Sequence, residues 1–276
     1  MARLLTLMLI ALAGCAPMVP PAPIQHTAAV PADYALLWHD EFARDGAPDA
    51  RYWAHDTAHN RSGWFNHELQ YYDGGEGGNA IVAGGVLRLT ARAEDLSART
   101  DFGGQRYSSG KLVTRGRMTW TYGFMDVRAK MPCGAGTWPA IWMLGAHGEW
   151  PAGGEIDIME QVGRNPGDVF GTVHNPATVS RALPSQSNHI AVPDACTAFH
   201  NYQAEWTPDS IRFLIDGREY GRYDRAGKGA GGWPYDRPNF MILNLAIGGD
   251  LGGSVDEAIF PAVFEVDYVR VYQRRW

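Results

Sequence analysis

The chain has 276 residues, 45% of them hydrophobic, and a formal net charge of −6 at pH 7. Single β-rich domains of this size are common, so a division into two domains is not required. The negative charge balance, with no run of lysine and arginine, argues against a nucleic-acid-binding protein, and we expect no nucleic acid as a partner.

Residues 1–15 have the character of an export signal. Arg3 gives a positive start, and residues 4–12 form an apolar run that is too short to span a bilayer as a permanent helix. Residues 12–15 read Leu-Ala-Gly-Cys, which resembles a bacterial lipobox, where the cysteine becomes the lipidated first residue after cleavage. We therefore expect Cys15 to be lipidated and the protein to be anchored at the bacterial cell envelope, at the outer membrane or in the periplasm. Ordinary secretion is the alternative.

Residues 16–31 follow as a segment rich in proline and alanine, without Asp, Glu, Lys or Arg. This composition is typical of an extended tether. The folded domain is then expected to comprise residues 32–276, and we expect it to be a monomer.

Two further cysteines, Cys133 and Cys196, lie within the expected domain. Export would place them in an oxidising compartment, so we expect them to form one disulfide. Two buried free thiols are the alternative.

From Trp38 onward the pattern is all-β. Short runs alternate apolar and polar side chains at residues 86–92, 124–130, 211–215 and 264–272. Asp216-Gly217, after the third run, is a hairpin-turn sequence. Because 33 glycines and 17 prolines separate short runs and no long segment has the helical period, we predict two packed antiparallel sheets.

One stretch of the chain carries three closely spaced acids, Glu155, Asp157 and Glu160. Glu155 and Asp157 alternate with isoleucines and so point to the same face of a strand. Glu160 has the opposite parity, so a β-bulge near residues 158–159 is needed to return it to that face. Crowded carboxyls raise one another's pKa, which keeps one protonated while another is ionised, as a glycosidase requires. A solvated strand edge or a metal site is the plainer interpretation.

The surroundings of these acids resemble the core of glycoside hydrolase family 16. The matching segments are residues 138–144 (Trp-Pro-Ala-Ile-Trp-Met-Leu), 154–160 (Gly-Glu-Ile-Asp-Ile-Met-Glu) and 171–174 (Gly-Thr-Val-His). The bulged acidic spacing is similar to that of the laminarinase-like branch, the endo-1,3-β-glucanases, and the resemblance covers residues 38–272. It implies a jelly-roll, concanavalin A-like β-sandwich with a concave substrate cleft. It also implies a retaining, endo-acting hydrolase of β-1,3 or mixed β-1,3-1,4 glucans.

The same resemblance implies residue roles. Glu155 would be the nucleophile, Glu160 the acid/base, and Asp157 the residue that tunes them. The other residues that it places near the sugar are Asn66, Arg128, Trp138, Trp142, Trp150, His174 and Asn244. Trp138 and Trp150 flank loops and are expected to be stacking platforms, with ordinary packing as the alternative. Arg128 could instead form an ion pair with Asp126, and His174 could be a buried histidine without a functional role.

Catalysis in this family would require no cofactor, but many relatives hold a structural calcium ion. By resemblance, Glu41, a carbonyl near Gly85 and Asp267 would be its ligands. Oxygen-only ligands suit calcium. The alternative for Asp267 is an ordinary solvent-facing acid on a strand.

Two other functions are open from the sequence. A relative of the same fold could cut agar, carrageenan or another galactan, although a sulfated substrate would favour a basic cleft. A lectin-like glucan-binding module could keep the sandwich without catalysis, but such a module has no need of two opposed carboxyls. The presence of both Glu155 and Glu160 favours the enzyme, with a neutral β-glucan polysaccharide as its partner.

Overall fold

The computed structural model describes residues 30–275. The predicted signal peptide, Cys15 and residues 16–29 of the predicted tether lie outside the described residues. Within them, no helix is long and apolar enough to cross a membrane.

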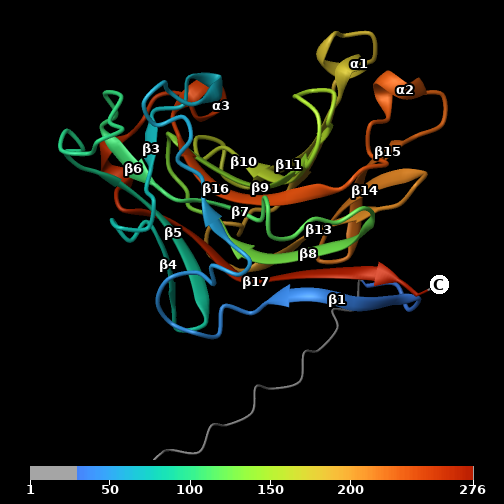
Figure 1. Cartoon of the computed structure of the whole chain (residues 1–276), viewed down its shortest axis with the longest axis horizontal. Coiled ribbons are helices and arrows are strands. Elements are labelled where there is room, and N and C mark those ends of the chain that lie inside the picture. Colours follow the sequence, from blue (N-terminus) through green and yellow to red (C-terminus); the bar gives the residue numbers. More distant parts are fainter. Residues whose placement is uncertain (1–29, 276) are drawn as a thin grey trace, which may run out of the picture.

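Two stacked β-sheets form the body of the domain, which confirms the predicted all-β sandwich (Figure 1). The larger sheet contains β1 (Tyr34–Asp40), β3 (Gln70–Tyr72), β4 (Ala80–Ala83), β5 (Val86–Ala93), β6 (Tyr107–Ser109), β8 (Gly123–Lys130), β13 (His200–Trp206), β14 (Ser210–Ile215), β15 (Arg218–Asp224) and β17 (Ala262–Arg274). Its strand order is β15-β14-β13-β8-β17-β5-β6-β3, with β1 paired to β17 and β4 to β5. Its pairs are antiparallel except β3–β6, which is parallel.

The smaller sheet carries the acidic motif. Its strands, in spatial order, are β12 (Gln186–Ala191), β11 (Asp168–His174), β10 (Glu155–Gln161), β9 (Thr137–Gly145), β16 (Asn239–Ile247), β7 (Lys111–Val113) and β2 (Ala54–His55). In Figure 1 this sheet lies above β8 and β17, and short helical turns rise at both of its sides. Those turns are η1 (Phe65–His67) and α3 (Gly249–Gly252) on one side and α1 (Pro176–Val179) and α2 (Gly229–Gly232) on the other; η2 (Glu257–Ile259) precedes β17.

The core fills the space between the sheets. Strand alternation sends one set of side chains inward, among them Ile141, Ile156 and Met159 from the smaller sheet and Val127 and Val269 from the larger one, all essentially without exposure. The other side chains of the smaller sheet remain on its outer face. This face is therefore free to carry polar residues, and the acids lie there.

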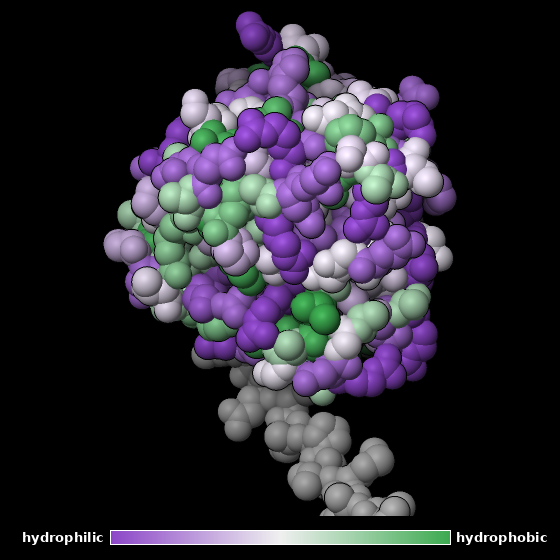
Figure 2. Space-filling view, turned by 90° about the vertical axis from the view of Figure 1, so that its left-hand side faces the viewer, coloured by the Kyte–Doolittle hydropathy of each residue, from purple (hydrophilic) through white to green (hydrophobic). Residues whose placement is uncertain are grey.

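The surface seen from the β3–β6 side is mixed. Figure 2 shows hydrophobic patches that are interrupted by hydrophilic residues. Scattered exposed apolar residues of this kind are normal on a folded domain.

Cys133 and Cys196 are joined in a disulfide, as predicted, with their Cα atoms 5.8 Å apart. Cys133 follows the end of β8, and Cys196 precedes the start of β13. Because these two strand ends are paired, the disulfide links neighbouring strands of the larger sheet.

Candidate active site

Strand β10 brings the three acids to one face through a local irregularity. Its register against β11 shifts between Asp157 and Glu160, and its register against β9 shifts between Asp157 and Met159. The shift is the bulge that the odd spacing of the acids requires. Without it, Glu160 would point into the apolar core, where an ionised carboxyl is strongly disfavoured.

All three acids line one cavity of about 230 Å³ on the outer face of the smaller sheet. Strands β7, β9, β10, β11 and β16 form its floor, and η1 and α3 form a wall. Its other side chains include Trp64, Phe65, Asn66, Glu68, Tyr72, Lys111, Trp138, Trp142, His174, Asn244 and Asp250. Aromatic faces mixed with convergent polar groups are suited to a sugar, whose rings have both apolar faces and hydroxyls.

Each acid has a specific partner. The indole N–H of Trp150 donates to Glu155 Oε2 over 2.5 Å, and that of Trp138 donates to Glu160 Oε1 over 2.9 Å. Glu155 and Asp157 share a side-chain hydrogen bond. His174 Nε2 lies 3.3 Å from Asp157 Oδ2. Neutral N–H donors orient the two glutamates without adding a fixed positive charge, so the carboxyls keep their tendency to bind protons.

Burial and mutual repulsion raise the pKa values of all three acids. Burial raises the pKa of Glu155 to about 8, and the neighbouring charge of Asp157 adds to the effect. Burial also raises the pKa of Glu160 to about 7, against the Trp138 hydrogen bond, which favours the ionised form. The pKa of Asp157 is raised well above its usual range, first by burial and then by the charge of Glu160. Glu155 and Asp157 can therefore share one proton across their hydrogen bond, while Glu160 remains protonated near neutral pH.

The two tryptophans expected as platforms differ in their setting. Trp150 is 56% exposed and lies beside His174, with ring centroids 6.4 Å apart. Trp138 is only 7% exposed, because Ala246 and Val162 pack around it. The structure thus gives Trp138 a function that the sequence pattern did not indicate, that of a hydrogen-bond donor to Glu160.

Replacing Trp138 with phenylalanine tests this contact. The change removes a donor that favours ionised Glu160, so the pKa of Glu160 rises and the alkaline limb of the kcat/KM–pH profile moves to higher pH. We also expect a loss of roughly 1–3 kcal/mol in transition-state binding. A profile that keeps its wild-type alkaline limb, in a variant with a native circular dichroism spectrum, would contradict the assignment.

A second hydrogen-bonded group lies on the β16–β7 side of the cavity. Trp142 Nε1 donates to Asn244 Oδ1 over 2.6 Å, and Asn244 Nδ2 donates to Tyr72 OH over 2.9 Å. Lys111 Nζ lies 4.3 Å from the centroid of the Trp64 ring. Trp142 and Asn244 were predicted from the sequence to lie near the sugar, whereas Tyr72, Lys111 and Trp64 were not.

Lys111 is buried and still has charged partners. Its ammonium lies 3.2 Å from Asp56 Oδ2, and burial lowers its pKa.

Asn66, in η1, has φ +56°, a left-handed conformation that asparagine tolerates better than most residues. It hydrogen-bonds to Glu68, whose pKa is raised by burial. Glu68 was also missed, although it stands two residues after Asn66, which had been predicted to lie near the sugar.

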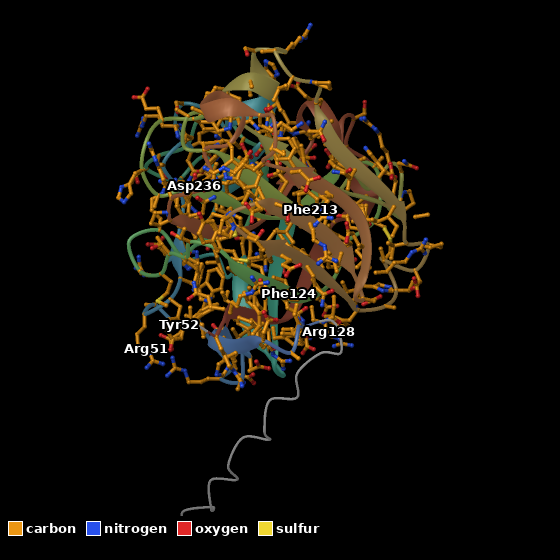
Figure 3. All side chains as sticks on the ribbon, turned by 90° about the vertical axis from the view of Figure 1, so that its right-hand side faces the viewer. Arg51, Tyr52, Phe124, Arg128, Phe213 and Asp236 are labelled. Carbon is orange, nitrogen blue, oxygen red and sulfur yellow. A yellow bond between two sulfur atoms is a disulfide. The ribbon has the colours of Figure 1, made fainter. Side chains whose placement is uncertain are left out.

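The expectation that Arg128 binds the sugar is wrong. Arg128 lies on β8 in the larger sheet, where it forms an ion pair with Asp267 and stacks over Phe199. Figure 3 labels Arg128 close to Phe124, which lies on the same strand, β8. Asp126, on the same strand, accepts hydrogen bonds from the side-chain amides of Asn201 and Gln203. Alternation along a strand distinguishes its two faces but does not indicate which sheet the strand joins.

The proposed calcium ligands do not fit an ion as they stand. Both carboxylate oxygens of Glu41 accept hydrogen bonds from Arg270 at 2.8 Å, and Asp267 is paired with Arg128. Across residues 30–275, no group of three or more His, Cys, Asp or Glu side chains is arranged to hold a metal. Because arginine already neutralises both carboxylates, a cation would have to displace two ion pairs.

Comparisons with a family model, with known sequences and with solved structures all identify the same family. The model of the glycosyl hydrolases of family 16 matches residues 70–270. A "Beta-glucanase" of Rhodothermus marinus is 46% identical over 255 residues, which cover 88% of this chain and 86% of that protein. The laminarinase structure from Rhodothermus marinus has a TM-score of 0.81 at 44% identity, and the match covers 88% of this chain and 98% of that one.

A further solved structure contains a ligand. A mutant of the non-specific endo-β-1,3(4)-glucanase SCLam, of the same family, presents a 1,3-β-D-cellobiosyl-glucose at its active site. It superposes with a TM-score of 0.85 at 47% identity, and the match covers 92% of this chain and all of that one.

Proposed function

This chain belongs to the glycosyl hydrolases of family 16, and from that membership we propose that it is a retaining endo-glycosidase of β-1,3 or mixed β-1,3-1,4 glucans. The observation that carries the proposal is the set of three buried carboxyls on one strand face, inside a cavity walled by aromatic rings. A binding module would gain nothing from burying three acids, which is costly unless they act chemically.

The mechanism follows from the protonation of the three acids. Glu155 attacks the anomeric carbon while Glu160 gives its proton to the glycosidic oxygen, so one bond to that carbon forms as the other breaks. Asp157 shares a hydrogen-bonded proton with Glu155, which adjusts the charge of Glu155 as the covalent intermediate forms and breaks. Glu160, now ionised, takes a proton from a water, which attacks the same carbon and releases Glu155. No step requires a cofactor.

The charges of the cavity favour a neutral glucan over a sulfated galactan. Of the described residues that line the cavity, Lys111 is the one with a fixed positive charge, and Asp56 already pairs with it. The acids would repel a sulfate group. The relatives' names support the same substrate class, since they are a β-glucanase, a laminarinase and an endo-β-1,3(4)-glucanase.

The experiment that tests this function measures reducing-sugar release from laminarin, lichenan, agarose and carrageenan in parallel. We expect release from laminarin and lichenan, with a rapid early fall in lichenan viscosity, as endo-cleavage requires. Early products should keep the β-configuration by NMR. Release from agarose or carrageenan alone would replace the glucanase proposal with the galactan alternative.

We further propose that the protein is anchored to the cell envelope through a lipid on Cys15. The support is the apolar run that ends in Leu-Ala-Gly-Cys, followed by the tether-like segment. In a bacterial host, Cys15→Ser is expected to abolish incorporation of labelled fatty acid and to reduce the membrane-bound fraction. Thr27→Ser, in the tether-like segment, is the matched control, because it leaves the lipobox cysteine and the disulfide in place. Equal labelling of wild type and Cys15→Ser would rule out the anchor.

A further inference from the structure

The outer face of the smaller sheet continues past the catalytic strand to its edge. Two rows of cross-strand partners lead there: Asp157–Thr172–Ser187 and Glu160–Phe170–His189. Directly opposed residues of antiparallel strands point to the same face. Adjacent strands are about 4.7–4.9 Å apart, close to the length of one sugar unit, so each strand crossed corresponds to about one unit of a polysaccharide chain.

A chain of polar groups runs along β12 and back to β11. Thr172 Oγ1 lies 3.1 Å from Ser187 Oγ, and Ser187 Oγ lies 3.4 Å from His189 Nε2. His189 Nδ1 lies 3.0 Å from Asp168 Oδ1, and Asn165 holds the other oxygen of that carboxylate at 3.0 Å. Because a carboxylate accepts from Nδ1, Nε2 is left as the acceptor that faces Ser187. The imidazole is thereby held in one orientation.

The same histidine forms an aromatic surface. Its ring is stacked on Phe170, with centroids 5.0 Å apart and an interplanar angle of 27°. Phe170 is 7% exposed, whereas the His189 side chain is 52% exposed. The buried phenylalanine supports the exposed imidazole. A ring held in place beside a hydroxyl is the combination that binds one sugar unit, by stacking and by a hydrogen bond.

The two sides of the catalytic strand differ in how closely they enclose a ligand. On the β9–β16 side, Trp138, Trp142 and Asn244 line the cavity together with η1 and α3. On the β11–β12 side, His174 is the one described residue of these strands that lines it. The sugar that becomes bound to Glu155 has to be retained, whereas the leaving group has to depart first. The enclosed side therefore suits the retained part and the open side suits the leaving group.

We propose that Ser187 and His189, supported by Phe170 and Asp168, bind the second sugar unit of the leaving group. This inference rests on the proposed glycosidase function and assigns the leaving-group side of the same cleft. It makes His189 a specificity-determining residue, because it favours substrates that extend at least two units beyond the cleaved bond.

The test compares two substrates in each variant. One is a β-1,3-linked glucose pentasaccharide, which can reach β12 on the leaving-group side. The other is a nitrophenyl glycoside of the β-1,3-linked disaccharide, whose leaving group is too short to do so. The readout is the kcat/KM value for the pentasaccharide divided by the kcat/KM value for the nitrophenyl glycoside. His189→Ala is expected to lower this ratio by about tenfold, and Ser187→Ala by about threefold, as single sugar contacts are lost.

A matched control is available on the larger sheet. His39, on β1, is similarly exposed and also faces a carboxylate, Glu41, at 3.3 Å. His39→Ala should leave the ratio at its wild-type value. An unchanged ratio in His189→Ala would overturn the proposal, as would an equal loss on both substrates, which would indicate an effect on the fold or the catalytic acids. If wild type cleaves neither substrate, the proposed function itself fails.

Discussion

Replacing Glu155 with alanine is expected to lower kcat/KM on a soluble β-glucan by on the order of 10⁴-fold or more, because the covalent intermediate can no longer form. With an activated β-glycoside as substrate, added azide should restore turnover and yield an α-glycosyl azide. Azide fits the space that the missing carboxylate leaves and attacks from that side, so the product has the opposite anomeric configuration. NMR of the product identifies the anomer.

Glu160→Ala is the matched variant, since it removes the same carboxyl group from the other side of the bulge. On an activated substrate the covalent intermediate still forms, because a good leaving group needs no proton. Azide should then open the intermediate and yield a β-glycosyl azide. The reverse pattern of products would exchange the roles of the two glutamates. Anomeric inversion by wild type would discard the double displacement altogether.

Glu160→Gln is expected to make the protein more stable at pH 8 while removing most of its hydrolytic activity. The pKa of Glu160 is raised by burial to about 7, from an ordinary value of 4.5. Between these values the folded state binds more protons than the unfolded state, so the free energy of unfolding falls as pH rises. The loss begins above pH 4.5 and is complete above about pH 7. It amounts to about 1–3 kcal/mol.

Glutamine keeps an oxygen for the Trp138 N–H but does not ionise, so the variant should lose this pH dependence. Thermal unfolding at pH 4.5 and pH 8 measures it. The variant should match wild type at pH 4.5 and unfold several degrees higher at pH 8. Glu76→Gln is the control, because that side chain is 86% exposed and should change neither midpoint. A variant less stable than wild type at pH 8 would contradict the burial argument.

The catalytic acids could be predicted because their pattern is local. The alternation of Glu155 and Asp157 with isoleucines placed both on one face, and the odd spacing of Glu160 required a bulge that the register of β10 contains. A strand of this kind is specified by its own residues, since a shift by one position would bury the charged set. The family resemblance then supplied the order of the roles, which the symmetry of three acids does not determine.

Residues that act across strands could not be predicted in the same way. Lys111 was not singled out, because its position beside Asp56 and Trp64 depends on how β7 meets β2 and the η1 segment. Trp138 was expected to be a stacking platform, but its hydrogen bond to Glu160 and its packing against Ala246 and Val162 were not predicted. Each of these contacts joins segments far apart in the chain, and no local period describes such a pairing.

By itself, the sequence determined the all-β character, the acidic face of β10 and its bulge, because these depend on side-chain period and on neighbours along the chain. Only the tertiary structure decided which sheet each strand joined. That choice turned Arg128 toward Asp267 and away from the cleft, and it set His189 on the row that begins at Glu160. The physical reason is that alternation distinguishes the two faces of a strand, whereas the neighbours of a strand are selected by packing over the whole domain.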